Sequence, residues 1–474
     1  MGGDRPQPHR SAIRAFLIIA GLAVSLLLLG AGAAPALAGD GALTLRRNAA
    51  PTAIKFTAPD TGEGLLDLTA WAPGVAWEKP GAESAVVSLW VDGAYTSDLV
   101  VFSSEPLTRR LALGHLEAGP HTLSARLAGD RSPPGARLAK LKDVAVSAVP
   151  PGDAEYTALR HAPVLYGRRL PSLGSPFQNA TTDTPLLAWH ETQPASIPGH
   201  SVIEYSIIWS NEDGGTDTPA LMARWGRTTD IEWVYRLEVD EVGDRVPGSA
   251  VYQGPGHLTL PFAGAFEGDH PRLQTCTSNN MVCAFANDPM RFFLAADATR
   301  PTDRARELLM DENGWTYQVM AAEMLREGKV EPLPDPATPE MSDQRNYLYV
   351  ELDKDTLPPN PQIGPWVGVA IGVRLAGDPT VYRSDHGIVD WSVQRDSPAA
   401  VTVELPLGTT AGDVVQIIAY RVVVGFETLR QVEVTDLNRA FLLSDSYLPQ
   451  PSFVEFHGSA TLGPFKPSAV LWSR

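Results

Sequence analysis

The sequence predicts a mainly β protein: a β-sandwich module followed by a larger β-rich, sandwich-like region with a short helical insertion. Three observations support this fold class. The 474 residues include 41 prolines and 41 glycines, the apolar stretches are short, and many of these stretches alternate apolar with polar residues. Short alternating stretches divided by turn-forming residues are typical of strands joined by tight turns.

Residues 1–38 have the features of a signal peptide. Three arginines precede an apolar run from Ala15 to Ala34, and Ala36 and Ala38 are the small residues that a signal peptidase reads. We expect cleavage after Ala38 and a secreted or extracytoplasmic protein. An uncleaved anchor is the alternative, because about twenty apolar residues can span a bilayer. After signal cleavage we expect no membrane span, since no later stretch is long and apolar enough.

The charge and the cysteine content limit the classes of binding partner and indicate the redox compartment of the protein. The formal net charge is −17, which argues against nucleic acid and anionic lipid, because clustered Lys and Arg carry phosphate binding. Cys276 and Cys283, the two cysteines, flank a polar turn sequence. In an oxidising compartment we expect them to form a disulfide. Closing so short a loop contributes about 2–3 kcal/mol.

Residues 39–150 are predicted to form the first sandwich, ending at a Pro-Pro-Gly linker. Ala85 to Val91 is strand-like, Asp92-Gly93 is a turn pair, and Asp98 to Phe102 returns as a strand. Residues 52–149 resemble the noncatalytic sandwich modules of secreted carbohydrate-active enzymes, through "L-x-A-G-x-H-T-L" at Leu116 to Leu123 and the strand around Trp90. The resemblance implies an exposed aromatic platform for sugars. The candidates are Trp71, Trp77 and Tyr95, with a core or rim position as the alternative.

Residues 151–474 are predicted to form one or two further β-rich domains. Ser201 to Ser210 and Thr229 to Val239 are the clearest early strands. Residues 203–274 resemble the vacuolar-protein-sorting-associated family that carries a Gly-Asp-Trp-Glu-His strand. Asp230 and Glu232 match its acid pair, whereas Thr229, Ile231 and Trp233 replace its Gly, Trp and His. That family has no established activity, so the resemblance implies a β-rich fold.

Asp230 and Glu232 are the first candidates for chemistry. Alternation along the strand puts them on one face, about 7 Å apart, opposite Ile231 and Trp233. Such a pair suits acid and base groups or a shared metal. A catalytic cleft would also include His190 and His257. The alternative is a solvated strand face on which arginines neutralise both carboxylates.

A second candidate site is the acidic loop that follows Ser210. Asn211, Asp213 and Asp217 offer oxygen ligands for calcium, although their spacing departs from the helix-loop-helix calcium motif. An ordinary acidic turn is the alternative.

Residues 301–329 break the β pattern, because apolar residues recur there at helical spacing until Gly328. We expect two short helices, followed by a Pro-rich tether over residues 331–339. Strands then return. The stretch from Val414 to Val424 is apolar enough for a central strand buried on both faces.

Two classes of function remain open. The first is a secreted binding or surface-interaction protein that presents loops and aromatic faces to extracellular glycan or protein. The second is a secreted polysaccharide-active hydrolase or lyase with the first sandwich as an accessory module. We favour the binding protein, because the sequence contains no recognised catalytic or metal-binding motif.

Overall fold

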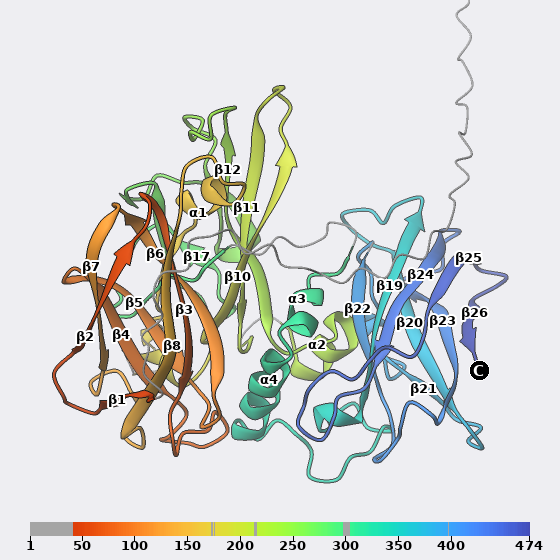
Figure 1. The fold of residues 1–474 in the computed structure, drawn as a ribbon. Helices are drawn as coiled ribbons and strands as arrows, with labels where there is room; N and C mark the ends of the chain where they lie inside the picture. The colour runs from red at the N-terminus through yellow and green to blue at the C-terminus, as the bar shows by residue number, and fades with distance from the viewer. Residues whose placement is uncertain (1–40, 172–173, 175, 213–215, 297–303, 397) are drawn as a thin grey trace, which may run out of the picture. The chain divides into compact units, whose positions relative to one another are not determined.

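The computed structural model describes residues 41–474 apart from 172–173, 175, 213–215, 297–303 and 397. The predicted signal peptide lies outside these residues. The described chain is mainly β and builds sandwich-like pairs of sheets with a few short helices, which confirms the predicted fold class (Figure 1). None of its helices has both the length and the apolar character needed to cross a bilayer.

The first eight strands form the N-terminal sandwich. One sheet has the order β1-β8-β3-β6 and the other the order β2-β7-β4-β5. The bounds are β1 (Leu43–Arg46), β2 (Thr52–Ala58), β3 (Gly62–Trp71), β4 (Ala85–Val91), β5 (Ala94–Val101), β6 (Leu107–Leu116), β7 (Gly119–Leu127) and β8 (Leu138–Val149). Asp92 and Gly93 join β4 to β5 with φ values of 48° and 83°. Both residues are in the conformation that tight hairpin turns require.

Two sheets follow in the middle region. The first has the order β10-β11-β12-β13-β14, and the second has the order β15-β16-β9-β18, with β17 paired to β16. The bounds are β9 (Val164–Tyr166), β10 (Pro185–Pro194), β11 (Ser201–Trp209), β12 (Asp230–Val239), β13 (Val251–Gly254), β14 (Leu258–Pro261), β15 (Phe266–Glu267), β16 (His270–Thr275), β17 (Val282–Cys283) and β18 (Arg291–Phe292). A bulge between β11 and β12 leaves Val234 without an opposite residue.

Four short α-helices accompany these sheets: α1 (Tyr156–Arg160), α2 (Thr218–Trp225), α3 (Leu308–Glu312) and α4 (Trp315–Arg326). The last two fall within the predicted helical stretch 301–329, of which 301–303 lie outside the described residues. Helix α2 was not predicted from the sequence. Its signals were present, however: Asp217 precedes it, Pro219 is in its first turn, and Gly226 ends it with a φ of 65°.

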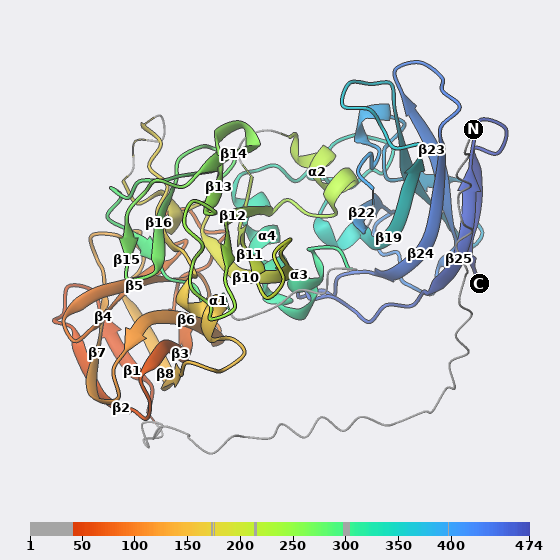
Figure 2. The same cartoon turned by 90° about the horizontal axis from the view of Figure 1, so that it is seen from above.

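The C-terminal strands form a second complete sandwich. Its sheets have the orders β22-β19-β24-β25 and β21-β20-β23-β26, and Figure 2 shows β19, β24 and β25 side by side. The bounds are β19 (Tyr347–Leu357), β20 (Trp366–Leu375), β21 (Val381–Arg383), β22 (Ala399–Glu404), β23 (Val414–Val424), β24 (Gln431–Phe441), β25 (Phe456–Leu462) and β26 (Ser468–Ser473).

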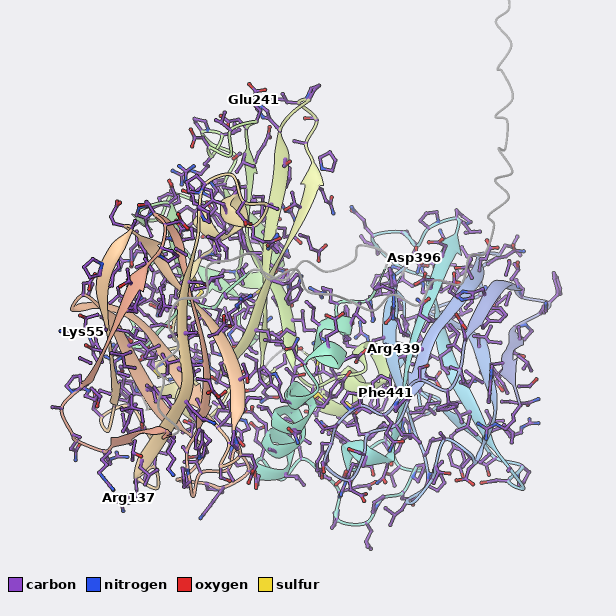
Figure 3. The ribbon with its side chains drawn as sticks, viewed as in Figure 1. Lys55, Arg137, Glu241, Asp396, Arg439 and Phe441 are labelled. Atoms are coloured by element: carbon purple, nitrogen blue, oxygen red, sulfur yellow. A yellow bond between two sulfur atoms is a disulfide. The ribbon has the colours of Figure 1, made fainter. Side chains whose placement is uncertain are left out.

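Two large apolar cores stabilise the described chain. One runs from the N-terminal sandwich through the middle region and α4 to Tyr349 of β19 and Phe441 of β24, and the other fills the C-terminal sandwich. Polar contacts join them. Arg439 of β24, labelled in Figure 3, contacts Glu351 of β19 at 2.9 Å and pairs with Asp311 of α3. The Thr402 hydroxyl of β22 donates to the Met222 carbonyl of α2 at 2.7 Å.

Candidate binding cleft and acidic cluster

A cavity of about 690 Å³, here called the cleft, opens between the N-terminal sandwich and the middle region. Its walls come from segments that are far apart in the sequence. The lining includes Glu63 of β3, Tyr95 of β5, His115 of β6, Tyr156 and Arg160 of α1, Glu267, Asp269 and His270 of the β15–β16 hairpin, and Arg291 of β18. The cleft therefore exists only when both regions are folded.

A carboxylate between two imidazoles forms the inner part of the cleft. The Glu63 side chain is buried, and its oxygens lie 3.3 Å from His270 Nε2 and 3.8 Å from His115 Nδ1. His270 Nδ1 lies 3.0 Å from the Ala162 carbonyl. Because a carbonyl only accepts, Nδ1 is the donor in this contact, and Nε2 is the ring nitrogen that faces Glu63. The inner cleft thus places a buried carboxylate against two imidazole rings.

Glycine makes room for this arrangement. Gly114 has a φ of 77°, and a Cβ there would lie 3.3 Å from the Phe293 ring and 3.8 Å from His270 Nε2. The ring centroids of Phe293 and His270 are 4.7 Å apart in an edge-to-face contact. A side chain at position 114 would strain the backbone and crowd this contact.

Ion pairs form the rim of the cleft. Arg160 Nε donates to Asp269 Oδ2 at 2.6 Å, and its NH1 donates to Asp244 at 2.9 Å. Burial alone would raise the pKa of Asp269, but the hydrogen bond and charge of Arg160 outweigh burial and lower it. Arg291 contacts Glu267 at 2.8 Å. The rim therefore offers hydrogen-bond donors and acceptors that ion pairs hold in place.

Two tyrosines add aromatic surface. Tyr156 is partly buried, and burial is the main cause of its raised pKa. The Tyr95 hydroxyl donates to Asp98 Oδ2 at 2.5 Å, and the Arg131 guanidinium carbon lies 5.0 Å from the Tyr95 ring centroid. Tyr95 is thus held rigidly, with a cation near its ring, and is a wall of the cleft rather than an open platform.

The predicted acid pair belongs to a different, buried site. Asp230 is 2 % exposed, and its pKa is raised well above the usual value by burial and then by the charges of Glu232 and Glu212. We call Glu212, Asp230 and Glu232 the acidic cluster. Asp230 is therefore not on a solvated strand face, because covering residues exclude water from it.

The disulfide supplies part of that cover. Cys276 and Cys283 are bonded, as predicted, with their Cα atoms 5.9 Å apart. The loop they close carries Asn280, whose Nδ2 donates to Asp230 Oδ2 at 3.1 Å and to Asp183 Oδ1 at 3.0 Å. Asp183 in turn forms a fully buried ion pair with Arg168 at 2.8 Å. The disulfide loop thus locks the acidic cluster into the polar core.

Of the predicted histidines, one reaches the acidic cluster. His257 Nδ1 lies 3.8 Å from Glu232 Oε1, and the Gln253 amide nitrogen is 3.0 Å from the same ring atom. His190 does not reach it. Its partner on β11 is Tyr205, whereas the partner of Asp230 is Trp209, four residues or about 13 Å further along. The expected cleft holding all four residues is therefore not formed.

The predicted aromatic platforms are separated as well. Trp77 is buried, and its indole nitrogen donates to Glu323 of α4 at 2.8 Å, so it cannot serve as an exposed platform. Trp71 is partly exposed, and the Lys140 ammonium lies 5.8 Å from its ring centroid. Of the three candidates, only Tyr95 lines the cleft.

The proposed calcium ligands diverge where they can be followed. Asp213 lies outside the described residues. The Asn211 amide donates to Glu327 Oε1 at 3.1 Å, and Asp217 is exposed before α2. Among the described residues, no group of three or more His, Cys, Asp or Glu is placed to hold a metal ion. Calcium binding stays a prediction.

Most residues of the cleft were not predicted from the sequence. Glu63, His115, Tyr156 and Asp269 each stand alone among ordinary strand, turn or helix residues, with no motif around them. The one available signal was the turn sequence Glu-Gly-Asp-His-Pro at residues 267–271, where Gly268 has a φ of 60°. This signal marks a hairpin but says nothing about what faces it.

No family model and no curated protein matches the chain. The resemblance of residues 203–274 to the vacuolar-protein-sorting-associated family is therefore unsupported.

The CBM36-1 domain of a multidomain xylanase from the hindgut metagenome of Trinervitermes trinervoides is 14 % identical, with a TM-score of 0.19, over 25 % of this chain and 89 % of that one. The family 35 carbohydrate binding module from Clostridium thermocellum is 17 % identical, with a TM-score of 0.17, over 24 % of this chain and 93 % of that one. A Paenibacillus sp. cycloisomaltooligosaccharide glucanotransferase is 11 % identical, with a TM-score of 0.19, over 54 % and 41 %. Scores this low carry no argument about function.

Proposed function

We propose that this protein is an exported carbohydrate-binding protein and that the cleft is its sugar site. The observation behind the proposal is the composition of the cleft, in which aromatic rings adjoin ion-paired donors and acceptors. Sugars present apolar C–H faces together with hydroxyls that both donate and accept, so they suit such a lining. A volume of about 690 Å³ also falls in the range of small-molecule sites.

The charges of the cleft favour a hydroxylated ligand over a strongly ionic one. Arg160 and Arg291 each have carboxylate partners, and the Glu63 carboxylate lies between two histidines. Paired charges keep their geometry and still offer spare hydrogen-bonding positions. A phosphate or sulfate ligand would have to displace these carboxylates from the arginines.

Export is part of the proposal. The leader at residues 1–38 supports it, as does the Cys276–Cys283 disulfide, because disulfides persist in oxidising compartments.

Affinity electrophoresis tests the proposal. Residues 39–474 are run through native gels cast with different soluble polysaccharides, and retardation in at least one gel is expected. Tyr156→Ala should weaken that binding about fivefold, because one aromatic contact contributes on the order of 1 kcal/mol. Trp71→Ala is the matched control and should leave the mobility unchanged, since Trp71 lies outside the cleft.

Two results would count against the sugar site. Unchanged mobility in every gel would exclude binding of the polysaccharides tested. Equal loss of retardation in Trp71→Ala and Tyr156→Ala would move the site to the open face of the N-terminal sandwich.

A second candidate function rests on the acidic cluster. The raised pKa of Asp230 beside Glu232 is the arrangement expected of a proton donor paired with a second carboxylate in a polysaccharide-active hydrolase or lyase. Release of reducing ends from a retained polysaccharide, abolished in Asp230→Asn and Glu232→Gln, would support it. Binding without product would leave the protein in the binding class.

A further inference from the structure

Three loops meet at one end of the C-terminal sandwich. Residues 358–365 join β19 to β20, residues 425–430 join β23 to β24, and residues 463–467 join β25 to β26. The strand registers place all three together, because Trp366 pairs with Val424, Leu357 with Gln431, and Val432 with Leu462. Each loop crosses from one sheet to the other. We call this end the loop end.

The loop end displays large apolar side chains to solvent. Phe465 is 98 % exposed, Ile363 87 %, Leu429 82 % and Phe426 71 %. Each of the three loops contributes at least one of them. Isolated exposed apolar residues are ordinary on protein surfaces, whereas a group gathered on neighbouring loops marks an interaction surface.

Hydrogen bonds hold the loops that carry these side chains. The Asn360 side chain donates to the Val367 carbonyl at 2.7 Å and accepts from the Val367 amide at 2.8 Å. Arg421 Nε donates to the Arg430 carbonyl at 2.9 Å. The amides and carbonyls of Gly463 and Lys466 pair at 3.0 and 3.1 Å. The apolar side chains are therefore displayed on ordered loops, so binding costs little conformational entropy.

The charge of the loop end differs from that of the whole chain. Its three loops contain Arg430, exposed Lys466 and a single carboxylate, Glu427. Glu427 is neutralised by Arg421, whose NH2 donates to it at 2.8 Å. In a chain with a net charge of −17, these three loops thus carry a net positive charge, while Asp355 and Glu433 lie on the strands that adjoin them. The overall acidity, which argues against anionic lipid, does not apply locally.

We propose that the loop end is a membrane-docking surface. Ile363, Phe426, Leu429 and Phe465 enter the interfacial layer of a bilayer, while Arg430 and Lys466 face anionic headgroups. Apolar side chains on projecting loops beside basic residues fit this layer, because it takes up short apolar groups and attracts cations. The occupant is a lipid surface that carries negative charge.

Vesicle flotation tests the proposal. Residues 39–474, which lie within the compact unit 34–474, are used because the apolar leader would itself bind lipid. The protein should float with phosphatidylcholine vesicles containing phosphatidylglycerol, and less with phosphatidylcholine alone. Phe426→Ser and Phe465→Ser should each reduce binding about tenfold, the loss expected for one buried side chain. Arg430→Glu with Lys466→Glu should abolish the preference for anionic vesicles.

Leu407→Ser is the matched control. Leu407 is 74 % exposed and Phe426 is 71 % exposed, so the two side chains are similarly accessible. Leu407, however, follows β22 at the opposite end of the same sandwich. It should float like the wild type, and thermal melts of all variants should coincide. Failure of the wild-type protein to bind either vesicle overturns the proposal. So does loss of self-association in Phe465→Ser with vesicle binding unchanged, which would make the loop end a contact between two copies.

Discussion

The acidic cluster and the cleft are built from the same residue types, but the pKa values of their carboxylates are shifted in opposite directions. Asp230 in the cluster is buried beside Glu232 and Glu212, and its pKa is raised. Asp269 at the cleft rim is bonded to Arg160, and its pKa is lowered. Burial among like charges favours the neutral acid, whereas an adjacent cation favours the carboxylate.

The two sites also differ in where their contacts lead. The contacts of the acidic cluster point inward, through Asn280 to Asp183 and Arg168. The ion pairs of the cleft border a cavity instead. Carboxylates near a histidine therefore do not mark a binding site by themselves. They must also line a cavity that a ligand can enter.

Among the variants that test this contrast, Asp183→Ala should have the largest effect on stability. It would remove the buried carboxylate that pairs with the Arg168 guanidinium at 2.8 Å, so we expect a loss of about 3–5 kcal/mol in the free energy of unfolding. Urea denaturation measures it. The control is Asp67→Ala, which removes an exposed partner of Arg110 at 3.0 Å and should cost less than about 1 kcal/mol. Equal losses in both variants would refute a structural role for the inward contacts.

Removing the disulfide is expected to have the next largest effect. Cys276→Ser with Cys283→Ser should lower the free energy of unfolding by about 2–3 kcal/mol, because the unfolded chain regains entropy. Thermal melts with and without reductant measure it, and reduced wild type should match the double variant. Retardation by polysaccharide should persist at temperatures where the variant is folded. Loss of retardation at those temperatures would indicate that the acidic cluster contributes to polysaccharide binding.

The pH dependence of stability should have opposite signs at the two sites. The folded state binds the Asp230 proton more tightly than the unfolded state does, so its contribution is complete at low pH. It is lost as pH rises above the ordinary value of 3.8. Asp230→Asn should therefore remove a decline in stability of at most about 1.4 kcal/mol per pH unit. Urea denaturation between pH 4 and 8 measures it, and an unchanged slope would contradict the prediction.

The smallest effect concerns the cleft rim. Asp269 has a lowered pKa, so its stabilising contribution is present above 3.8 and is lost as pH falls through the folded value. Asp269→Asn should cost about 0.5 kcal/mol at pH 7 and nothing near pH 2, because the pair with Arg160 is partly exposed. Thermal melts at both pH values measure it. A loss of stability in Asp269→Asn that grows toward low pH would contradict the lowered pKa of Asp269.

Much of the secondary structure could be predicted from local patterns. The strand at Ala85–Val91, the Asp92-Gly93 turn and the strand at Trp366–Leu375 all follow from alternation and turn residues that lie next to one another. The stretch Val414–Val424 was also recognised as a strand, but its burial on both faces was wrong. Gln416 and Tyr420 are partly exposed, because one face of β23 is turned away from the core of the sandwich.

Sequence alone determined the β fold class, the pairing of Cys276 with Cys283 and the acid pair as a local feature of one strand. These properties depend on neighbouring residues or on a choice between two cysteines. The tertiary structure alone decided that Asp230 is buried beneath Asn280 and that Glu63, Tyr156 and His270 border one cavity. Such juxtapositions depend on how distant strands and loops pack, and no period or spacing along the chain encodes them.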